Sequence, residues 1–196
     1  MKIINNKEAV LIKVKKDGNT LKCTNKKFKN DKVVLAAVQQ HGNSLQYASE
    51  LLKNDKEIIL IAIQRDGEVL RYASELLKND KDVVLVAVQQ NGCALEYASE
   101  ELKNDKEVVL AAVKKRGYSL QYASEELKNY KEVVLAAIQQ NRLAIFFASK
   151  QLINKISDGE PISKLKVLIK IEQEKINLEN KVKQFDKIDK KLFIKI

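Results

Sequence analysis

The sequence predicts an all-α fold, specifically an α-solenoid of about six helix-turn-helix repeats of 24–25 residues with a C-terminal helix. The first observation is repetition, because "LEYASEELKNDKEVVLAAV" (residues 95–113) returns as "LQYASEELKNYKEVVLAAI" (residues 120–138). The second is composition: the 196 residues include only one Pro and six Gly, and 45% are hydrophobic. Repetition at such a period is typical of solenoids, whose units bury their apolar faces only against neighbouring units.

Six leucines mark the copies, and a glycine follows seven residues after each of the first five. These leucines are Leu11, Leu35, Leu60, Leu85, Leu110 and Leu135. The first half of a copy, for example "EVVLAAVKKRG" (107–117), predicts a short helix packed on several sides. We expect Gly117 to end this helix in the left-handed conformation that glycine adopts readily.

The second half of a copy, for example "SLQYASEELKN" (119–129), predicts one amphipathic helix of about ten residues. Leu120, Ala123 and Leu127 fall at positions i, i+3 and i+7 and would face the core. Each copy is therefore expected to consist of two α-helices of similar length.

The string "KND" closes each copy and contains two residue types that begin helices. Asn104 lies three residues before Glu107, as in a capping box, and Asn129 keeps this spacing where Tyr130 has replaced the Asp. The comparison favours Asn over Asp as the N-cap. The alternative is that Asn ends the preceding helix.

A longer string, "LxYASxxLKNDKEVVLAAVxxNG", recurs in the copies that start at Leu45, Leu70, Leu95 and Leu120. Over residues 31–153 it resembles the repeat known as domain of unknown function 4116, and it is more distantly similar to leucine-rich variant repeats. The latter resemblance implies a helical solenoid that pairs an α-helix with a second short helix. Neither resemblance implies an activity or a catalytic residue.

The two ends of the array depart from this pattern. Cys23 and Thr24 replace Tyr-Ala in the first copy, and Arg142 replaces Gly in the sixth, as expected for terminal capping units. We therefore predict a repeat array over residues 1–156, with an atypical first copy at 7–30 as the N-terminal cap.

Residues 157–196 predict an amphipathic C-terminal helix. Its apolar residues recur at helical or coiled-coil spacing. They are Leu168, Ile171, Leu178, Val182, Phe185 and Leu192. The helix could cap the end of the array or associate with another copy of the chain.

The net charge of +10 is concentrated at the ends of the chain. Residues 1–30 carry +7, residues 31–156 carry 17 positive and 17 negative side chains, and residues 157–196 carry +3. A neutral body argues against a protein that follows phosphates along its whole length. The lysine-rich first copy keeps nucleic-acid binding as the alternative function, against the simpler explanation of a solvated end. Its lysines are Lys13, Lys15, Lys16, Lys22, Lys26, Lys27 and Lys29.

No pattern in the sequence indicates catalysis, a metal site or a cofactor. His41 is the only histidine, and the serines at 49, 74, 99, 124 and 149 repeat, whereas a nucleophilic serine needs one unique site with a base. We expect these serines to make backbone or interhelix hydrogen bonds. Cys23 and Cys93 lack the spacing of a zinc site or disulfide framework. An aromatic ladder at 47, 72, 97, 122 and 147 is expected to pack in or near the core.

No segment has the length of a membrane span, and the lysine-containing N-terminus does not resemble a signal peptide. We therefore expect a cytoplasmic protein without membrane contact, or one in the host cytoplasm if it is a secreted effector.

The residues that vary between copies are the candidates for recognition. The turn after the first helix differs in every copy and would form a ridge if the copies stack in register. The predicted partner-binding residues are His41, Asn43, Asp66, Glu68, Arg71, Lys114, Lys115, Arg116 and Tyr118. The predicted function is a non-enzymatic scaffold for protein–protein interaction, such as an effector or inhibitor. Drift on an unconstrained surface is the competing explanation of the variation.

Overall fold

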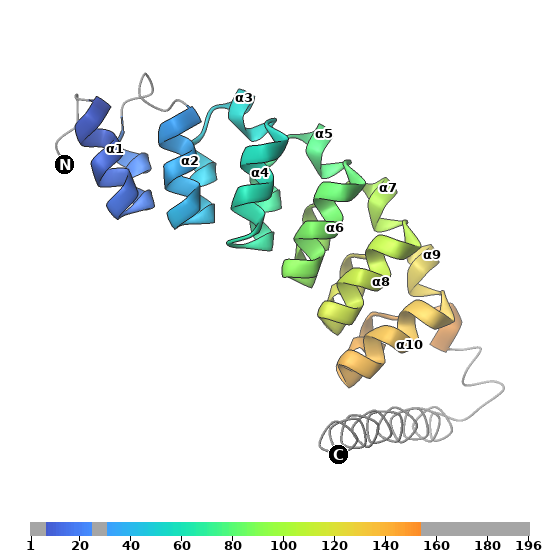
Figure 1. Ribbon diagram of the computed structural model, residues 1–196. Helices are drawn as coiled ribbons and strands as arrows, with labels where there is room; N and C mark the ends of the chain where they lie inside the picture. Colours follow the sequence, from blue (N-terminus) through green and yellow to red (C-terminus); the bar gives the residue numbers. More distant parts are fainter. Residues whose placement is uncertain (1–6, 25–30, 154–196) are drawn as a thin grey trace, which may run out of the picture. The chain divides into compact units, whose positions relative to one another are not determined.

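The computed structural model describes residues 7–24 and 31–153, and the repeat array predicted from the sequence is an all-α solenoid (Figure 1). The chain divides into two compact units, Met1–Ala148 and Ser149–Ile196. In the second unit, Ser149 Oγ accepts a hydrogen bond from Leu152 N–H at 3.1 Å. The helix predicted for residues 157–196 lies outside the described residues, as does the predicted boundary at 156.

Each copy begins with a long α-helix. These helices are α1 (Lys7–Lys16), α2 (Asp31–Gln40), α4 (Lys56–Ile63), α6 (Lys81–Gln90), α8 (Lys106–Lys115) and α10 (Lys131–Gln140). An extended residue follows each of α6, α8 and α10, which breaks the helical hydrogen-bond pattern.

A six-residue 3-10 helix follows each long helix. These are η1 (Gly18–Cys23), η3 (Gly42–Tyr47), η4 (Gly67–Tyr72), η5 (Gly92–Tyr97), η6 (Gly117–Tyr122) and η7 (Arg142–Phe147). In four of them an Asp or Asn at the N-cap accepts a hydrogen bond from the backbone two residues later, a bond that initiates a tight turn.

A one-turn α-helix then completes the second to fifth copies. These helices are α3 (Glu50–Lys53), α5 (Glu75–Lys78), α7 (Glu100–Lys103) and α9 (Glu125–Lys128). The prediction of one continuous amphipathic helix over 119–129 was therefore wrong. Ala123 is extended, and Ser124 caps the new helix by accepting a hydrogen bond from Leu127 N–H at 3.2 Å. Serine competes with helical backbone bonding and is favoured at such breaks.

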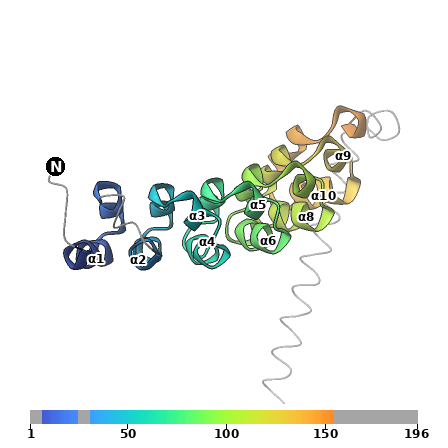
Figure 2. The same cartoon turned by 90° about the horizontal axis from the view of Figure 1, so that it is seen from above.

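The copies of the first unit stack in chain order (Figure 1). Each long helix packs against the long helices of adjacent copies, and each 3-10 helix packs against adjacent 3-10 helices. Viewed from above, the two kinds of helix form two layers (Figure 2). Each long helix also contacts the 3-10 helix of the preceding copy, so every copy bridges both layers.

The core lies between these layers and is built from the same positions in every copy. In the fifth copy Val108, Val109, Ala112 and Val113 of α8 have no exposed surface. Leu120, Ala123 and Leu127 are also buried, at 0%, 5% and 5% exposure. The positions predicted to face the core, Leu120, Ala123 and Leu127, are thus confirmed as buried. They lie, however, on a 3-10 helix, an extended residue and a short α-helix instead of on one α-helix. Burial of each Val or Leu stabilises the fold by about 1.5–3 kcal/mol.

The glycine that starts a 3-10 helix allows close approach of two copies. Among the described residues no glycine has a positive φ, so the predicted left-handed role of Gly117 was wrong. A Cβ placed on Gly67 would lie 2.5 Å from the carbonyl oxygen of Ala87 in the next copy. Arg142 occupies this position in the sixth copy, which no further copy of the repeat follows in the sequence.

The N-cap of α4, α6 and α8 is the Asp of "KND". Asp105 Oδ1 accepts from the N–H groups of Glu107 and Val108 at 2.9 and 3.1 Å. Asn104 is instead the C-cap of α7, so the preference for Asn as N-cap was wrong. The sequence analysis favoured Asn because Asn129 is kept where Tyr130 replaces the Asp. In the structure, however, Tyr130 is at the N-cap of α10 and forms no side-chain cap, so the retained Asn129 does not act as the N-cap.

Hydrogen bonds join successive copies along the "KND" edge. Ser99 N–H donates to Lys78 C=O at 3.0 Å, and Ser99 Oγ donates to Asn79 Oδ1 at 2.5 Å. The same backbone bond is made by Ser74 and Ser124. The expectation that the repeated serines form backbone and interhelix hydrogen bonds is therefore confirmed.

Lysines at the first helical position add ion pairs between copies on this edge. Lys81 Nζ lies 2.8 Å from both Asp105 Oδ2 and Glu107 Oε2 of the next copy. Hydrogen bonds to these carboxylates raise the pKa of Lys81 to about 12. Burial tends to raise the pKa of Asp105, but the bond from Lys81 and the backbone N–H groups hold it below its ordinary value. The Asp therefore both caps its own helix and binds the preceding copy.

Gly67→Ala tests the close approach of copies. Alanine in place of glycine is normally neutral or stabilising where the backbone permits it. Here we expect a loss of about 1–3 kcal/mol in unfolding free energy, because the Cβ meets a backbone carbonyl. Urea unfolding followed by circular dichroism measures it, with Arg142→Ala as the control at the equivalent position. A midpoint equal to or above the parent's for Gly67→Ala would contradict the proposed constraint.

Tyr130→Asp tests the capping role of Asp. Restoring the cap of α10 should raise the unfolding free energy by about 1 kcal/mol. The contact of Lys106 Nζ with the Tyr130 ring, at 4.7 Å from its centroid, is lost, but an ion pair like that of Lys81 can replace it. The thermal midpoint should rise for Tyr130→Asp and fall for the converse variant Asp105→Ala. The reverse order would show that the cap is unimportant.

Candidate protein-interaction surface

The candidate surface is the edge formed by the turns between each long helix and its 3-10 helix. We call it the turn edge and define it by residues 40–43, 65–68, 90–93, 115–118 and 140–143. Unlike the "KND" edge, it changes in sequence from copy to copy. Because the copies stack in order, these segments lie in one row (Figure 1).

At the start of the turn edge His41 faces the first copy. Its Nε2 lies 3.5 Å from Asp17 Oδ1, and both side chains are about half exposed, at 51% and 57%. Asp17 also accepts a hydrogen bond from Asn19 N–H at 3.0 Å and so caps η1. His41 therefore links the second copy to the first.

Four further predicted residues form a hydrogen-bonded network across copies. Asn43 Nδ2 donates to Asp66 Oδ2 at 3.1 Å, and Arg71 Nη2 donates to Asn43 Oδ1 at 2.9 Å. Glu68 Oε1 accepts from Asn91 Nδ2 of the next copy at 2.9 Å. These side chains bind other copies of the repeat. The sequence analysis did not predict this, because the sequence does not show which side chains of adjacent copies lie within hydrogen-bonding distance.

Arg71 makes several contacts within this network. Its guanidinium lies 4.7 Å from the centroid of the Tyr72 ring, and its Nη1 lies 3.9 Å from Glu68 Oε2. The Nε atom is buried without a hydrogen-bond partner. A cation on an aromatic face and beside a carboxylate stabilises the fold, which leaves little of Arg71 for an outside ligand.

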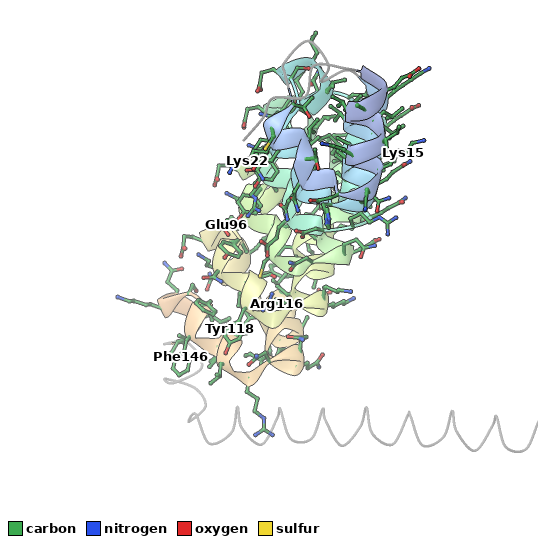
Figure 3. The ribbon with its side chains drawn as sticks, turned by 90° about the vertical axis from the view of Figure 1, so that its left-hand side faces the viewer. Lys15, Lys22, Glu96, Arg116, Tyr118 and Phe146 are labelled. Carbon is green, nitrogen blue, oxygen red and sulfur yellow. The ribbon has the colours of Figure 1, made fainter. Side chains whose placement is uncertain are left out.

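The remaining predicted residues, Lys114 to Arg116 and Tyr118, lie in the fifth copy. Lys114, Lys115 and Arg116 are exposed and form no ion pair among the described residues. The Tyr118 ring is half-buried and packs edge-to-face on Phe147, with centroids 5.8 Å apart and planes at 78°. Figure 3 labels Arg116 and Tyr118 on the array. This cluster remains available on the surface.

A hollow of about 380 Å³ opens on the turn edge between the third, fourth and fifth copies. Its lining brings together three of the predicted residues with others that the sequence analysis did not select. The lining residues are Arg65, Asp66, Gly67, Gln90, Asn91, Gly92, Lys115 and Arg116. A usable signal was the position two residues before the first residue of each 3-10 helix, which is Gln, Arg or Lys in the second to sixth copies.

The aromatic ladder lies half-buried at the ends of the 3-10 helices, as predicted. Burial, together with the nearby Glu96 carboxylate, raises the pKa of Tyr122 to about 12. A phenol in such a setting stays neutral at physiological pH. The ladder therefore acts mainly as packing volume between copies.

The described residues contain no cluster of three or more His, Cys, Asp or Glu that could hold a metal ion. Within the same ranges, 7–24 and 31–153, no helix is long and apolar enough to cross a bilayer.

Comparison with known families gives one result. The family model described as "Domain of unknown function (DUF4116)" matches residues 32–78, 55–103 and 105–153, which covers more than half of the chain. The chain belongs to the DUF4116 family. No curated protein and no solved structure matches this DUF4116 chain. The family resemblance noted from the repeated string is thus confirmed, and its boundaries agree with copies two to six of the array.

The raised pKa of Tyr122 in this DUF4116 protein predicts how stability depends on pH at the alkaline end. The folded chain holds the phenolic proton more tightly than the unfolded chain, whose pKa is near 10.0. This contribution is fully present below about pH 10 and is lost as pH rises through about 12. A tyrosinate absorbance titration should show one late step that Tyr122→Phe removes. Loss of an earlier step instead would contradict the assignment, and Tyr47→Phe is the matched control.

Proposed function

We propose that this DUF4116 protein is a non-enzymatic helical repeat scaffold that binds a protein partner through its turn edge. The observation that carries the proposal is the unequal use of the two polar edges. The constant "KND" residues bond to neighbouring copies, whereas exposed cations of the turn edge form no ion pair among the described residues. Side chains that are both variable and unpaired are the ones available for recognition.

Several features support a binding role over catalysis. The repeated serines accept hydrogen bonds from backbone N–H groups at helix N-termini, so each has a structural use. His41 lies beside Asp17 on the surface, with both side chains about half exposed. A rigid row of short turns with different side chains is typical of solenoid proteins that bind extended partners. Within the same proposal, the scaffold acts in the cytoplasm, or in a host cytoplasm as an effector or inhibitor.

The alternative function is nucleic-acid binding by the first copy. Its described lysines, Lys13, Lys15, Lys16 and Lys22, are exposed and form no ion pair among the described residues. Lys15 and Lys22, however, point to different sides of this copy in Figure 3. Lys26, Lys27 and Lys29 lie outside the described residues. We favour protein binding because the array between residues 31 and 156 carries no net charge.

The double variant Arg116→Ala/Tyr118→Ala tests the proposal. Wild-type protein is crosslinked in a lysate of its natural cell or host, and captured proteins are identified by mass spectrometry. We expect at least one protein to be captured by the parent and its recovery to fall about tenfold for the variant, because exposed contact atoms are removed.

The matched control is Lys131→Ala, an exposed lysine at the opposite edge that has no following copy to bind. It should capture as the parent does. Equal capture by the double variant would rule out this part of the turn edge. Failure of the parent to enrich any protein over an unrelated helical repeat protein would rule out the scaffold function itself.

A further inference from the structure

The hollow on the turn edge has a charge pattern that identifies the chemistry of its ligand. Three of its lining residues are cationic, Arg65 from the third copy and Lys115 with Arg116 from the fifth. All three are exposed, and none forms an ion pair among the described residues. Other cations, such as Lys114, also form no ion pair in the described part of the chain, whereas the lysines of the "KND" edge at 53, 56, 78, 81, 103, 106 and 128 have carboxylate partners.

The one acid in the hollow is already occupied. Asp66 Oδ1 accepts from Glu68 N–H at 2.9 Å, and Asp66 Oδ2 accepts from Asn43 Nδ2 at 3.1 Å. Both carboxylate oxygens of Asp66 therefore already accept hydrogen bonds from groups of the fold. Three cations against one bonded carboxylate leave the hollow with an unbalanced positive charge, in a stretch that is neutral as a whole.

A comparison with the sixth copy shows why Lys115 is not bonded to the fold. In the sixth copy Gln140 turns back, and its Oε1 accepts a hydrogen bond from Gly117 N–H of the fifth copy. Lys115 is the equivalent residue one copy earlier, opposite Gly92. A lysine ammonium has no acceptor atom, so it cannot bond to that N–H group. The substitution of Lys for Gln leaves a cation at the hollow in place of a side chain bonded to the fold.

Neutral amides accompany these cations. Gln90 lines the hollow, is exposed and has no side-chain partner among the described residues. A carboxamide can donate to a peptide carbonyl and accept from a peptide N–H, so it suits a polypeptide backbone. Asn91 is less available, since it accepts from Cys93 N–H and donates to Glu68. The combination of guanidinium groups, an ammonium and a carboxamide matches acidic side chains on a peptide.

We propose that this hollow binds an acidic segment of a partner protein, with Asp or Glu carboxylates paired to Arg65, Lys115 and Arg116. This inference rests on the proposed scaffold function and assigns the class of partner. A peptide is favoured over a nucleic acid because the three cations form one local cluster, whereas residues 31–156 as a whole carry no net charge and offer no continuous row of cations to a phosphate chain. Guanidinium groups also bind carboxylates in a bidentate geometry.

The test uses the full-length protein and a triple variant, Arg65→Gln/Lys115→Gln/Arg116→Asn. Each new residue occurs at the same position in another copy. Gln90 and Gln140 are equivalent to positions 65 and 115, and Asn91 is equivalent to position 116. The variant should therefore fold, which its circular dichroism and thermal midpoint establish. Arg142→Gln removes one cation from the same edge outside the hollow and serves as the matched control.

The probe is a short fluorescein-labelled peptide rich in Asp and Glu, measured by fluorescence anisotropy. Two further probes are the same peptide with Asn and Gln in place of the acids and a single-stranded oligonucleotide of equal charge. We expect the acidic peptide to bind the parent and the Arg142→Gln control equally, and the triple variant about tenfold more weakly. Binding to the parent should weaken with added salt more than binding to the triple variant.

Three results would overturn the inference. They are no binding of the acidic peptide by the parent, equal binding by the folded triple variant, and tighter binding of the oligonucleotide. None of them decides the scaffold function, because partner capture is measured separately and does not depend on this peptide. Capture of a partner whose recovery is unchanged by the triple variant would retain the scaffold and reject the acidic segment.

Discussion

The close contact between successive backbones is the constraint on which the rest of the array depends. The glycine that starts each of η1, η3, η4, η5 and η6 lies against a carbonyl oxygen of the long helix in the next copy, with space for no more than a hydrogen atom at Gly67 or Gly18. This contact sets the register between copies. The buried valines, the serine bonds and the lysine ion pairs can recur only because every copy meets its neighbour in the same way.

That register divides the polar residues into two groups with different uses. On the "KND" edge Lys56 and Lys81 bind the Asp of the next copy, and Lys106 binds Glu132 where Tyr130 replaces that Asp, so these residues are nearly constant. Asp105, for example, caps α8 and also binds Lys81 of the preceding copy. On the turn edge the side chains face solvent or an adjacent turn, and many combinations of residues can form the hydrogen bonds between adjacent turns. Asn43 with Asp66 and Glu68 with Asn91 are two such solutions.

The variable positions consequently belong to two classes that the sequence does not separate. His41, Asn43, Asp66, Glu68 and Arg71 each contact a neighbouring copy or carboxylate. Lys115 and Arg116 have no such partner in the described part of the chain and border the hollow. Variation selects residues of both classes, and pairing between copies decides which of them remain available to a ligand.

The sequence by itself determined the helical class, the period, the six copies and the apolar positions, because each unit must bury the same faces against its neighbours. It did not determine the backbone conformation of the second half of each copy. Leu120, Ala123 and Leu127 have the spacing of one α-helix and are buried. They lie, however, on a 3-10 helix, an extended residue and a short α-helix. Only the tertiary structure showed why Gly67 is glycine, why Asp105 and not Asn104 caps, and where Arg65 meets Lys115. The glycine contact and the hollow bring together residues twenty or more positions apart, and Asn104 is bonded to Ser124 of the next copy, all of which local preferences do not encode.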